Sequence, residues 1–456
     1  MNSSVAMMIL GLVLGIGILI FLVLKTKIHA FPALIIAASI TGLVGGMTPP
    51  TVIEAITAGF GNTLASIGLV IGFGVMMGRI LEISGAAERL AFTFLKWLGK
   101  RKEEWALAMT GYVVSIPIFL DSAFVILTPL AKALSSKTGK SVIGLGVALG
   151  LGLTATHHAV PPTPGPLGVA GIFKVDVGMM MLWGLVFAIP IVITGVYYGK
   201  WIGKRIYQLP NEDGTDWVRP DQPQTFQEFV EMEERKNLPS LMRSMLPILV
   251  PLVLILGNTI LSALELKGGV YDYFVFLGSP VIAVGIGLLI ALYGLFGHLR
   301  RSEALERMEE GIQSAGIILL VTGAGGALGN VLRESGAGEE IAKLIAQTAI
   351  PAVLLPFFIA TIVRLIQGSG TVAMITAASI AAPIISSLDV NMALAAQGAA
   401  LGAMIFSYFN DSMFWVVNRM LGIRNVKEQI LTWSVPTTLA WAVSLVMLVV
   451  ANWIVG

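Results

Sequence analysis

Long apolar runs, separated by short polar or basic stretches, dominate the pattern along this chain. A helix that crosses a bilayer needs about 20 mostly apolar residues, and runs of this length recur throughout the sequence; their total length allows about ten full spans. We expect these spans at residues 5–24, 28–47, 56–80, 142–160, 179–198, 245–264, 274–296, 312–332, 392–409 and 430–450. The pattern therefore predicts an all-α polytopic membrane protein.

Several apolar segments contain breaks that a plain spanning helix does not tolerate. Residues 105–134 are broken at Pro117 and Pro129 and have basic residues on both sides, which predicts a hairpin that enters and returns. Residues 350–385 contain a polar tip and predict a second, re-entrant hairpin. Broken helices are expected at about 142–168 and about 392–415. At membrane depth such irregular backbone must face protein or a watery cavity.

Basic residues give the orientation and the division of the chain. Lys25 and Lys27 follow the first run, so the positive-inside rule places the N-terminus outside and this loop in the cytoplasm. The only long hydrophilic segment, residues 206–240, is then a cytoplasmic linker, which we expect to be partly helical. It separates a first half, residues 1–205, from a second half, residues 241–456.

A weak internal repeat relates the two halves. Three glycines of the first half recur at one constant offset in the second: Gly72, Gly74 and Gly78 match Gly323, Gly325 and Gly329. The two copies begin on opposite sides of the membrane, which predicts an inverted-topology repeat of the kind found in many secondary transporters. The glycines themselves are expected to be helix-packing surfaces rather than ligand contacts.

Composition supports the membrane assignment and removes several classes of function. The chain is 56% hydrophobic and 12% charged, whereas soluble domains have about 25% charged residues. Cysteine is absent, which excludes disulfides, thiol nucleophiles and Cys-ligated clusters. No metal-binding or nucleophile–base motif stands out, so we expect no enzyme, cofactor or metal. The net charge of +2 gives no reason to expect a nucleic-acid partner.

The chemistry is expected at four polar breaks, two in each half. Half-helix N-termini expose backbone amides that attract anions, and nearby hydroxyls and carboxamides can orient a hydroxylated solute. The predicted substrate-binding residues are Thr154, Thr156, His157, His158, Arg364, Gly368, Ser369, Thr371, Ser407 and Asn410.

Asp121 and Asp411 are the predicted proton-coupling residues. A carboxylate at the bilayer centre costs at least about 2.5–3.5 kcal/mol, so its presence needs a reason. One reason is a proton or cation site. The other is structural, either an ion pair with Arg364 or Arg419 or, for Asp411, a cap on the next helix.

The cationic candidates also have two interpretations each. His157 and His158 could donate to a substrate carboxylate or titrate near neutral pH. Alternatively, a neutral ring could bond a backbone carbonyl that the following prolines leave free. Arg364 could hold an anionic substrate or serve as an internal counter-ion for an aspartate.

With these residues in view, the chain resembles the gluconate permease (GntP) family over nearly its whole length. Three motifs carry the resemblance: Thr156-His157 followed by the Pro161–Pro166 run, the segment Gly368–Ala373, and Asn410-Asp411 before Phe414-Trp415. The resemblance implies proton symport of sugar acids, with D-serine carried by one branch. It also implies a dimeric elevator, with the hairpins and broken helices forming a moving domain.

The sequence departs from the gluconate pattern at three positions. Asp121 stands where a glutamate is typical, His158 where a glycine is frequent, and Thr163 where a histidine is common. These positions are where we expect specificity or coupling to differ.

The expected function is proton-coupled uptake of a small hydroxylated monocarboxylate, such as gluconate, across the bacterial inner membrane. The expected partners are this organic anion, the proton, membrane lipid and a second copy of the chain. Alternatives are uptake of D-serine or glycerate-like acids, coupling to Na⁺, and a passive anion channel.

Overall fold

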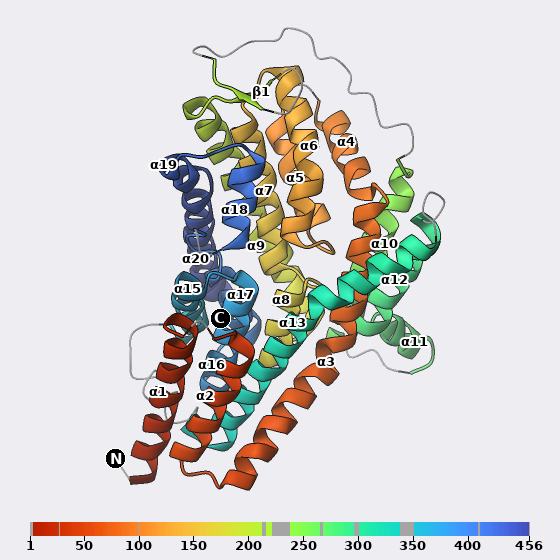
Figure 1. Cartoon of the computed structure of the whole chain (residues 1–456). Coiled ribbons are helices and arrows are strands. Elements are labelled where there is room, and N and C mark those ends of the chain that lie inside the picture. Colours follow the sequence, from red (N-terminus) through yellow and green to blue (C-terminus); the bar gives the residue numbers. More distant parts are fainter. Residues whose placement is uncertain are drawn as a thin grey trace.

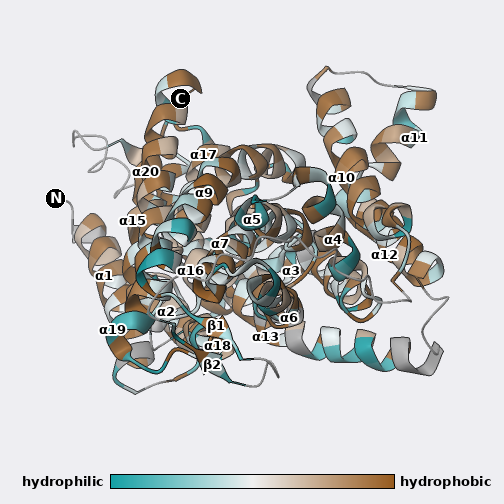
Figure 2. Ribbon diagram, turned by 90° about the horizontal axis from the view of Figure 1, so that it is seen from above, coloured by the Kyte–Doolittle hydropathy of each residue, from teal (hydrophilic) through white to brown (hydrophobic). Residues whose placement is uncertain are grey.

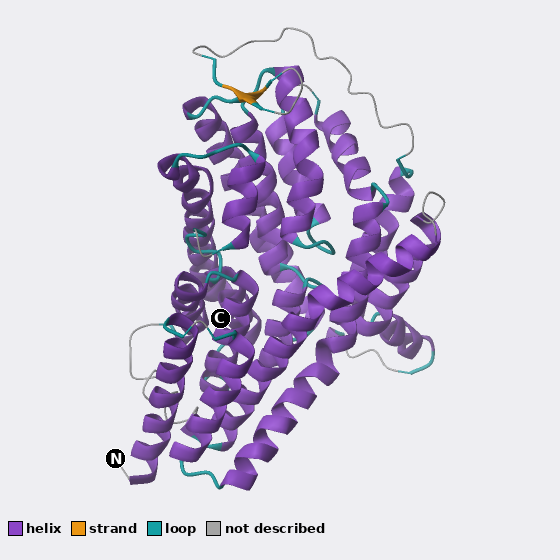
Figure 3. Ribbon diagram, viewed as in Figure 1, coloured by secondary structure: helices purple, strands orange, loops and turns teal. Residues whose placement is uncertain are grey.

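The computed structural model describes residues 3–26, 28–99, 101–211, 216–220, 238–264, 268–295, 301–337, 351–408 and 411–455. These residues form an almost entirely helical protein (Figures 1 and 3). The helices before the linker are α1 (Ser3–Leu24), α2 (Ala30–Val44), α3 (Pro49–Ile83), α4 (Ala86–Leu98), α5 (Glu103–Val114), α6 (Leu120–Thr138), α7 (Val142–Ala159), α8 (Pro164–Phe173) and α9 (Val177–Arg205).

Further helices follow the linker in the described part of the chain. They are α10 (Leu241–Ala263), α11 (Val270–Leu277), α12 (Pro280–Leu295), α13 (Arg301–Glu334), α15 (Leu355–Gln367), α16 (Gly370–Ile385), α17 (Met392–Gly402), α18 (Ser412–Met420), α19 (Val426–Gln429) and α20 (Val435–Val455). Two short turns complete them, the 3₁₀ turn η2 (Ala352–Leu354) and the π-helical turn η3 (Ile430–Ser434).

Large hydrophobic side chains are exposed on peripheral helices such as α10 and α20, as expected for a protein surrounded by lipid. Figure 2 shows the ribbons of both helices coloured mostly as hydrophobic. Five helices in the described part of the chain are individually long and apolar enough to cross a membrane, and seven spans result if two bent helix pairs are included. The expected number of about ten full spans is higher. The difference arises partly because α2 and α17 are apolar but shorter than a full span.

Both predicted hairpins are present as pairs of helices joined by a tight loop. The first consists of α5 and α6, and the prolines Pro117 and Pro129 lie in its loop and inside α6. The second consists of α15 and α16, which pack against each other. Gly368, with φ +87°, ends α15, and Ser369 caps α16 by accepting a hydrogen bond from the amide of Val372. A left-handed φ of this kind favours glycine.

The two expected helix breaks are also present. α7 ends at Ala159 immediately before Pro161 and Pro162, and α8 begins at Pro164. Thr163 bridges the gap because its hydroxyl donates to the carbonyl oxygens of His157 and Val160. In the second half, residues 403–411 separate α17 from α18. α7 is buried along its whole length, so the first broken helix forms the centre of the protein.

The repeated glycines lie on the two longest helices and mostly serve packing, as predicted. An added Cβ at Gly78 of α3 would lie 2.4 Å from the carbonyl oxygen of Pro117 in the first hairpin loop. At Gly325 of α13 it would lie 2.3 Å from the hydroxyl oxygen of Ser379 in α16. Gly72 is different, because no other atom lies within 4 Å of such a Cβ. α3 and α13 therefore pack closely against the hairpins.

The described part of the linker forms a short antiparallel ladder, not the helix expected there. β1 (Leu209–Pro210) pairs with β2 (Trp217–Val218); residues 212–215 and 221–237 lie outside the described residues. Arg219 binds Glu428 through two hydrogen bonds of 2.7 and 2.8 Å, which raise the pKa of Arg219. This ladder docks on the loop between α18 and α19, where Trp217 packs against Gly422.

Candidate functional site

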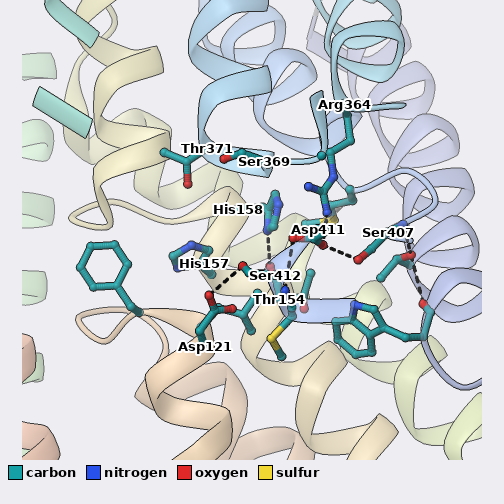
Figure 4. Close-up of a pocket in the computed structure, with 18 residues that line it drawn as sticks. Asp121, Thr154, His157, His158, Arg364, Ser369, Thr371, Ser407, Asp411 and Ser412 are labelled. Carbon is teal, nitrogen blue, oxygen red and sulfur yellow. Dashed lines mark hydrogen bonds and ion pairs between the residues drawn. The ribbon is translucent and has the colours of Figure 1, made fainter. Parts of the chain in front are cut away.

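A cavity of about 370 Å³ lies where both hairpins and both helix breaks meet. Its walls come from five segments that are far apart in the sequence (Figure 4). The lining residues are Phe119, Leu120, Asp121, Thr154, His157, His158, Arg364, Gly368, Ser369, Gly370, Thr371, Met404, Ser407, Asp411, Ser412, Met413, Trp433 and Thr437. The volume lies within the ~300–1,000 Å³ typical of small-molecule sites.

Three helices begin at this cavity. Their cap residues are Phe119 for α6, Ser369 for α16 and Asp411 for α18, and all three line its wall. The first amides of a helix have no partner within the helix, and the helix dipole makes this end partly positive. Three such ends around one cavity create an environment that favours an anion.

Asp411 connects the second hairpin to the second helix break. Its Oδ2 accepts a 2.5 Å hydrogen bond from Nη2 of Arg364 and another from the hydroxyl of Ser407. Its Oδ1 accepts from the amide of Met413, at 3.3 Å, and so caps α18. Both structural interpretations of Asp411 are therefore present together, the ion pair and the helix cap.

Asp121 lies at the start of α6 and has a different environment. Its Oδ2 accepts a 3.0 Å hydrogen bond from the hydroxyl of Ser412. No cation forms an ion pair with it among the described residues. In Figure 4, Asp121 lies below the two histidines, on the opposite side of the site from Arg364.

The two histidines end α7 and have 8% and 5% of their surface exposed. The Nδ1 of His158 lies 3.2 Å from the carbonyl oxygen of Thr154, one turn earlier in the same helix. This oxygen belongs to the body of α7 and is not one of the carbonyls that the prolines leave free. The ring of His157 packs beside Phe119, with 6.1 Å between the ring centroids.

Several buried nitrogen atoms of lining residues have no hydrogen-bond partner in the described part of the chain. They are Nε and Nη1 of Arg364, Nδ1 of His157, Nε2 of His158 and Nε1 of Trp433. A buried polar atom left without a partner costs about 1–3 kcal/mol. Such a concentration at one cavity indicates a site built for a polar ligand. No cluster of three or more metal-ligating side chains occurs among the described residues.

All but two of the predicted site residues line this one cavity. Thr156 does not line it. Thr154, His157 and His158 share one face of α7 because the histidines follow Thr154 by three and four positions, and Thr156 lies on another face. Asn410 lies outside the described residues. Thr163, where a change of specificity was expected, is buried in the first helix break and is not a lining residue.

The sequence reasoning missed one wall of the cavity. Trp433 and Thr437 line it from η3 and the start of α20, in a segment predicted as a plain span. The hydroxyl of Thr437 accepts a 3.1 Å hydrogen bond from the amide of Ser407. The hydroxyl of Ser434 donates to the carbonyl oxygen of Ser407. The polar residues and Pro436 within this apolar run were the signal that could have revealed it.

Comparisons with known proteins agree with this architecture. The chain is 53% identical to an uncharacterised permease of Haemophilus influenzae, over 98% of this chain and 93% of that protein. It is 33% identical to the high-affinity gluconate transporter of Escherichia coli, over 97% of this chain and 98% of the relative.

A solved structure shows a similar fold. The YdaH transporter of Alcanivorax borkumensis has a TM-score of 0.64 to this chain at 15% identity, covering 89% of this chain and 90% of that one. The model of the GntP family permeases matches residues 7–454. The chain is thus a multi-pass inner-membrane transporter and not an enzyme, and it belongs to the GntP family of permeases.

Proposed function

We propose that this permease takes up a small hydroxylated monocarboxylate, such as gluconate, together with a proton. The Escherichia coli relative is a high-affinity gluconate transporter, which supports this class of substrate. The chemistry of the cavity supports it independently.

The guanidinium of Arg364 is the observation that carries the proposal. One nitrogen, Nη2, is bound to Asp411, while Nε and Nη1 are buried and have no partner among the described residues. Guanidinium N–H groups make strong hydrogen bonds to a carboxylate, and Nε and Nη1 can each offer one. The N-termini of α16 and α18, whose cap residues line the cavity, add amides and partial positive charge. A substrate carboxylate is therefore expected at Arg364.

Hydroxyl groups around the rest of the wall suit the polyol part of a sugar acid. The lining residues that supply them are Thr154, Ser369, Thr371, Ser407, Ser412 and Thr437. A hydroxyl can both donate and accept, so this lining can match a chain of substrate hydroxyls in more than one register. Met404 and Met413 provide the apolar surface against the carbon chain.

The charges of the site support proton coupling through Asp121. The charges of Arg364 and Asp411 cancel within their ion pair. An entering carboxylate would share the cavity with the carboxylate of Asp121, and two like charges in a low-dielectric site repel strongly. A proton on Asp121 removes this repulsion, so anion and proton are expected to bind together.

We propose that the hairpins and broken helices form the moving domain of an elevator, built from inverted repeats, and that the transporter is a homodimer. The packing supports such a division. Residues of α6, α7, α15, α16 and α18 line the cavity, whereas α1, α2, α3 and α13 pack with one another and supply no lining residue. Cross-linking in membranes with substrate present and absent would test both proposals.

Uptake by purified protein in proteoliposomes tests the function. Labelled gluconate, glycerate and D-serine are offered with an inward proton gradient, with a sodium gradient, and with neither. We expect gluconate or glycerate to accumulate only with the proton gradient. Accumulation that follows the sodium gradient would instead show Na⁺ coupling, and equilibration without accumulation would indicate a passive channel. Preference for D-serine would contradict a hydroxy acid as substrate.

A further inference from the structure

The geometry at His158 determines which of its ring nitrogens carries the hydrogen. Nδ1 faces the carbonyl oxygen of Thr154 at 3.2 Å. A carbonyl oxygen can only accept, so Nδ1 is the donor and carries the hydrogen. In the neutral ring Nε2 is then a bare lone pair, which accepts hydrogen bonds and cannot donate them.

This lone pair is buried and has no partner among the described residues. It lies at the start of α16, where a Cβ on Gly370 would come within 2.4 Å of Nε2. Because Gly370 has no side chain, the ring of His158 fits against the start of α16. Figure 4 shows His158 in the middle of the site, between the guanidinium of Arg364 and the side chains of Thr154 and Ser412.

The neighbouring charges favour the neutral ring. His158 shares the cavity with the cationic Arg364, and a second buried cation would be repelled by it. Asp411, the carboxylate nearest to Arg364, already accepts from that guanidinium and from Ser407. Asp121 is bonded to Ser412. The site thus offers donors at Arg364 and a neutral ring nitrogen at His158 that can only accept.

We infer that His158 accepts a hydrogen bond from a substrate hydroxyl through Nε2 while Arg364 holds the substrate carboxylate. The inference rests on the proposed function and narrows it. The substrate is a hydroxy acid whose hydroxyl lies close enough to the carboxylate to reach His158. A neutral hydroxyl suits this acceptor better than an ammonium group, which would lie beside the guanidinium of Arg364.

Loss of that hydroxyl should be costly for binding. A site built to hydrogen-bond a substrate hydroxyl rejects the analogue that lacks it, because the buried acceptor is left without a partner. For one neutral acceptor we expect at least about tenfold weaker binding of the deoxy acid, which corresponds to about 1.4 kcal/mol. Without the acceptor, the two acids should bind with similar affinity.

Calorimetric titration of the purified full-length transporter tests this. The sugar-acid ligands are gluconate, 2-deoxygluconate and 3-deoxygluconate, glycerate and serine form a second pair of ligands, and the variants are His158→Ala and Gly370→Ala. The matched control is His29→Ala, which removes a histidine that caps α2 away from the cavity. In the wild type and in His29→Ala, one deoxy acid should bind at least about tenfold more weakly than gluconate. In His158→Ala the affinity for gluconate should exceed that for the same deoxy acid by less than about twofold.

Gly370→Ala provides a second route, because the new methyl group displaces His158 without removing it. It should also lower the ratio of the affinity for gluconate to the affinity for the deoxy acid. If neither variant folds, the wild-type titration still decides, since equal affinity for all three acids would overturn the inference. A tenfold ratio that persists in His158→Ala would also overturn it, and so would serine binding as tightly as glycerate. Those outcomes leave gluconate transport intact, whereas failure of every sugar acid to bind contradicts the proposed function and this inference with it.

Discussion

Arg364 donates a 2.5 Å hydrogen bond to Asp411 and so joins the second hairpin to the second helix break. Both side chains are buried, with 6% and 9% of their surface exposed. Removing one partner of a buried pair leaves an uncompensated charge and costs about 3–5 kcal/mol. The pair therefore has a structural role in addition to the proposed contact with substrate.

Arg364→Gln is expected to lower stability and to abolish binding of sugar acids. It removes the group that binds the substrate carboxylate, and it leaves the buried carboxylate of Asp411 without its ion-pair partner. The double variant Arg364→Gln/Asp411→Asn should recover much of the lost stability, since no unpaired charge remains, but not the binding. Thermal unfolding and ligand titration of the three proteins measure the two effects separately. Binding of gluconate by the double variant with wild-type affinity would show that the carboxylate does not need Arg364.

Asp121→Asn is expected to separate substrate exchange from accumulation. Asparagine resembles a protonated carboxyl group that cannot release its proton, so gradient-driven uptake should be lost. Exchange of internal for external gluconate needs no net proton movement and should persist. Both are measured in proteoliposomes. Asp176→Asn is the matched control, because Asp176 caps α9 outside the cavity; accumulation by Asp121→Asn at the control's rate would contradict the assigned role.

Gly150→Ala is expected to change the size of substrate that fits. A Cβ at Gly150 would lie 2.6 Å from the ring of Trp433, which lines the cavity, so the indole must move. Overpacking of this kind costs about 1–3 kcal/mol. Affinity for gluconate should fall more than affinity for the smaller glycerate. Gly72→Ala is the control, since no other atom lies within 4 Å of its added Cβ, and an equal loss for both acids would refute the size argument.

The docking of the linker can be tested with two glycines that follow the end of a helix in the same way. Gly422 and Gly46 have positive φ, +73° and +95°, and each amide donates to the carbonyl oxygen three residues earlier, so alanine is strained at both, by about 1–2 kcal/mol. Only at Gly422 would the new Cβ also collide with a side chain, 1.9 Å from Nε1 of Trp217, whereas a Cβ at Gly46 meets nothing within 4 Å. Gly422→Ala should therefore lower the thermal unfolding midpoint more than Gly46→Ala. Equal shifts would mean that the contact with Trp217 adds nothing to stability.

Much of the architecture could be predicted from the sequence because its signals are local. The break expected near residue 160 lies between α7 and α8, and Gly368-Ser369 ends one helix and caps the next. Proline clusters mark a break wherever the helix lies, since a missing amide and a ring clash need no tertiary context. For the same reason, most of the polar residues at these breaks were recognised as a group.

The remaining features depend on contacts that the sequence pattern does not contain. Asp411 looks like a helix cap or an ion-pair partner, and only the fold shows that it is both. Trp433 falls within the segment predicted as a plain span, yet it is 1% exposed and forms a wall of the cavity. The β ladder of the linker is stabilised by docking on the loop after α18, which propensity alone cannot reveal.

The hydrogen bond between Ser412 and Asp121 joins residues 291 positions apart. A ribosome adds about 5–20 residues per second, so Asp121 is synthesised about 15–60 s before its partner. During that interval the carboxyl group must wait in water, in the translocon or, protonated, beside lipid. Correct insertion of the first hairpin therefore depends on cellular machinery that tolerates an unpaired acid, and delayed translation of the second half should expose the nascent protein to quality-control proteases.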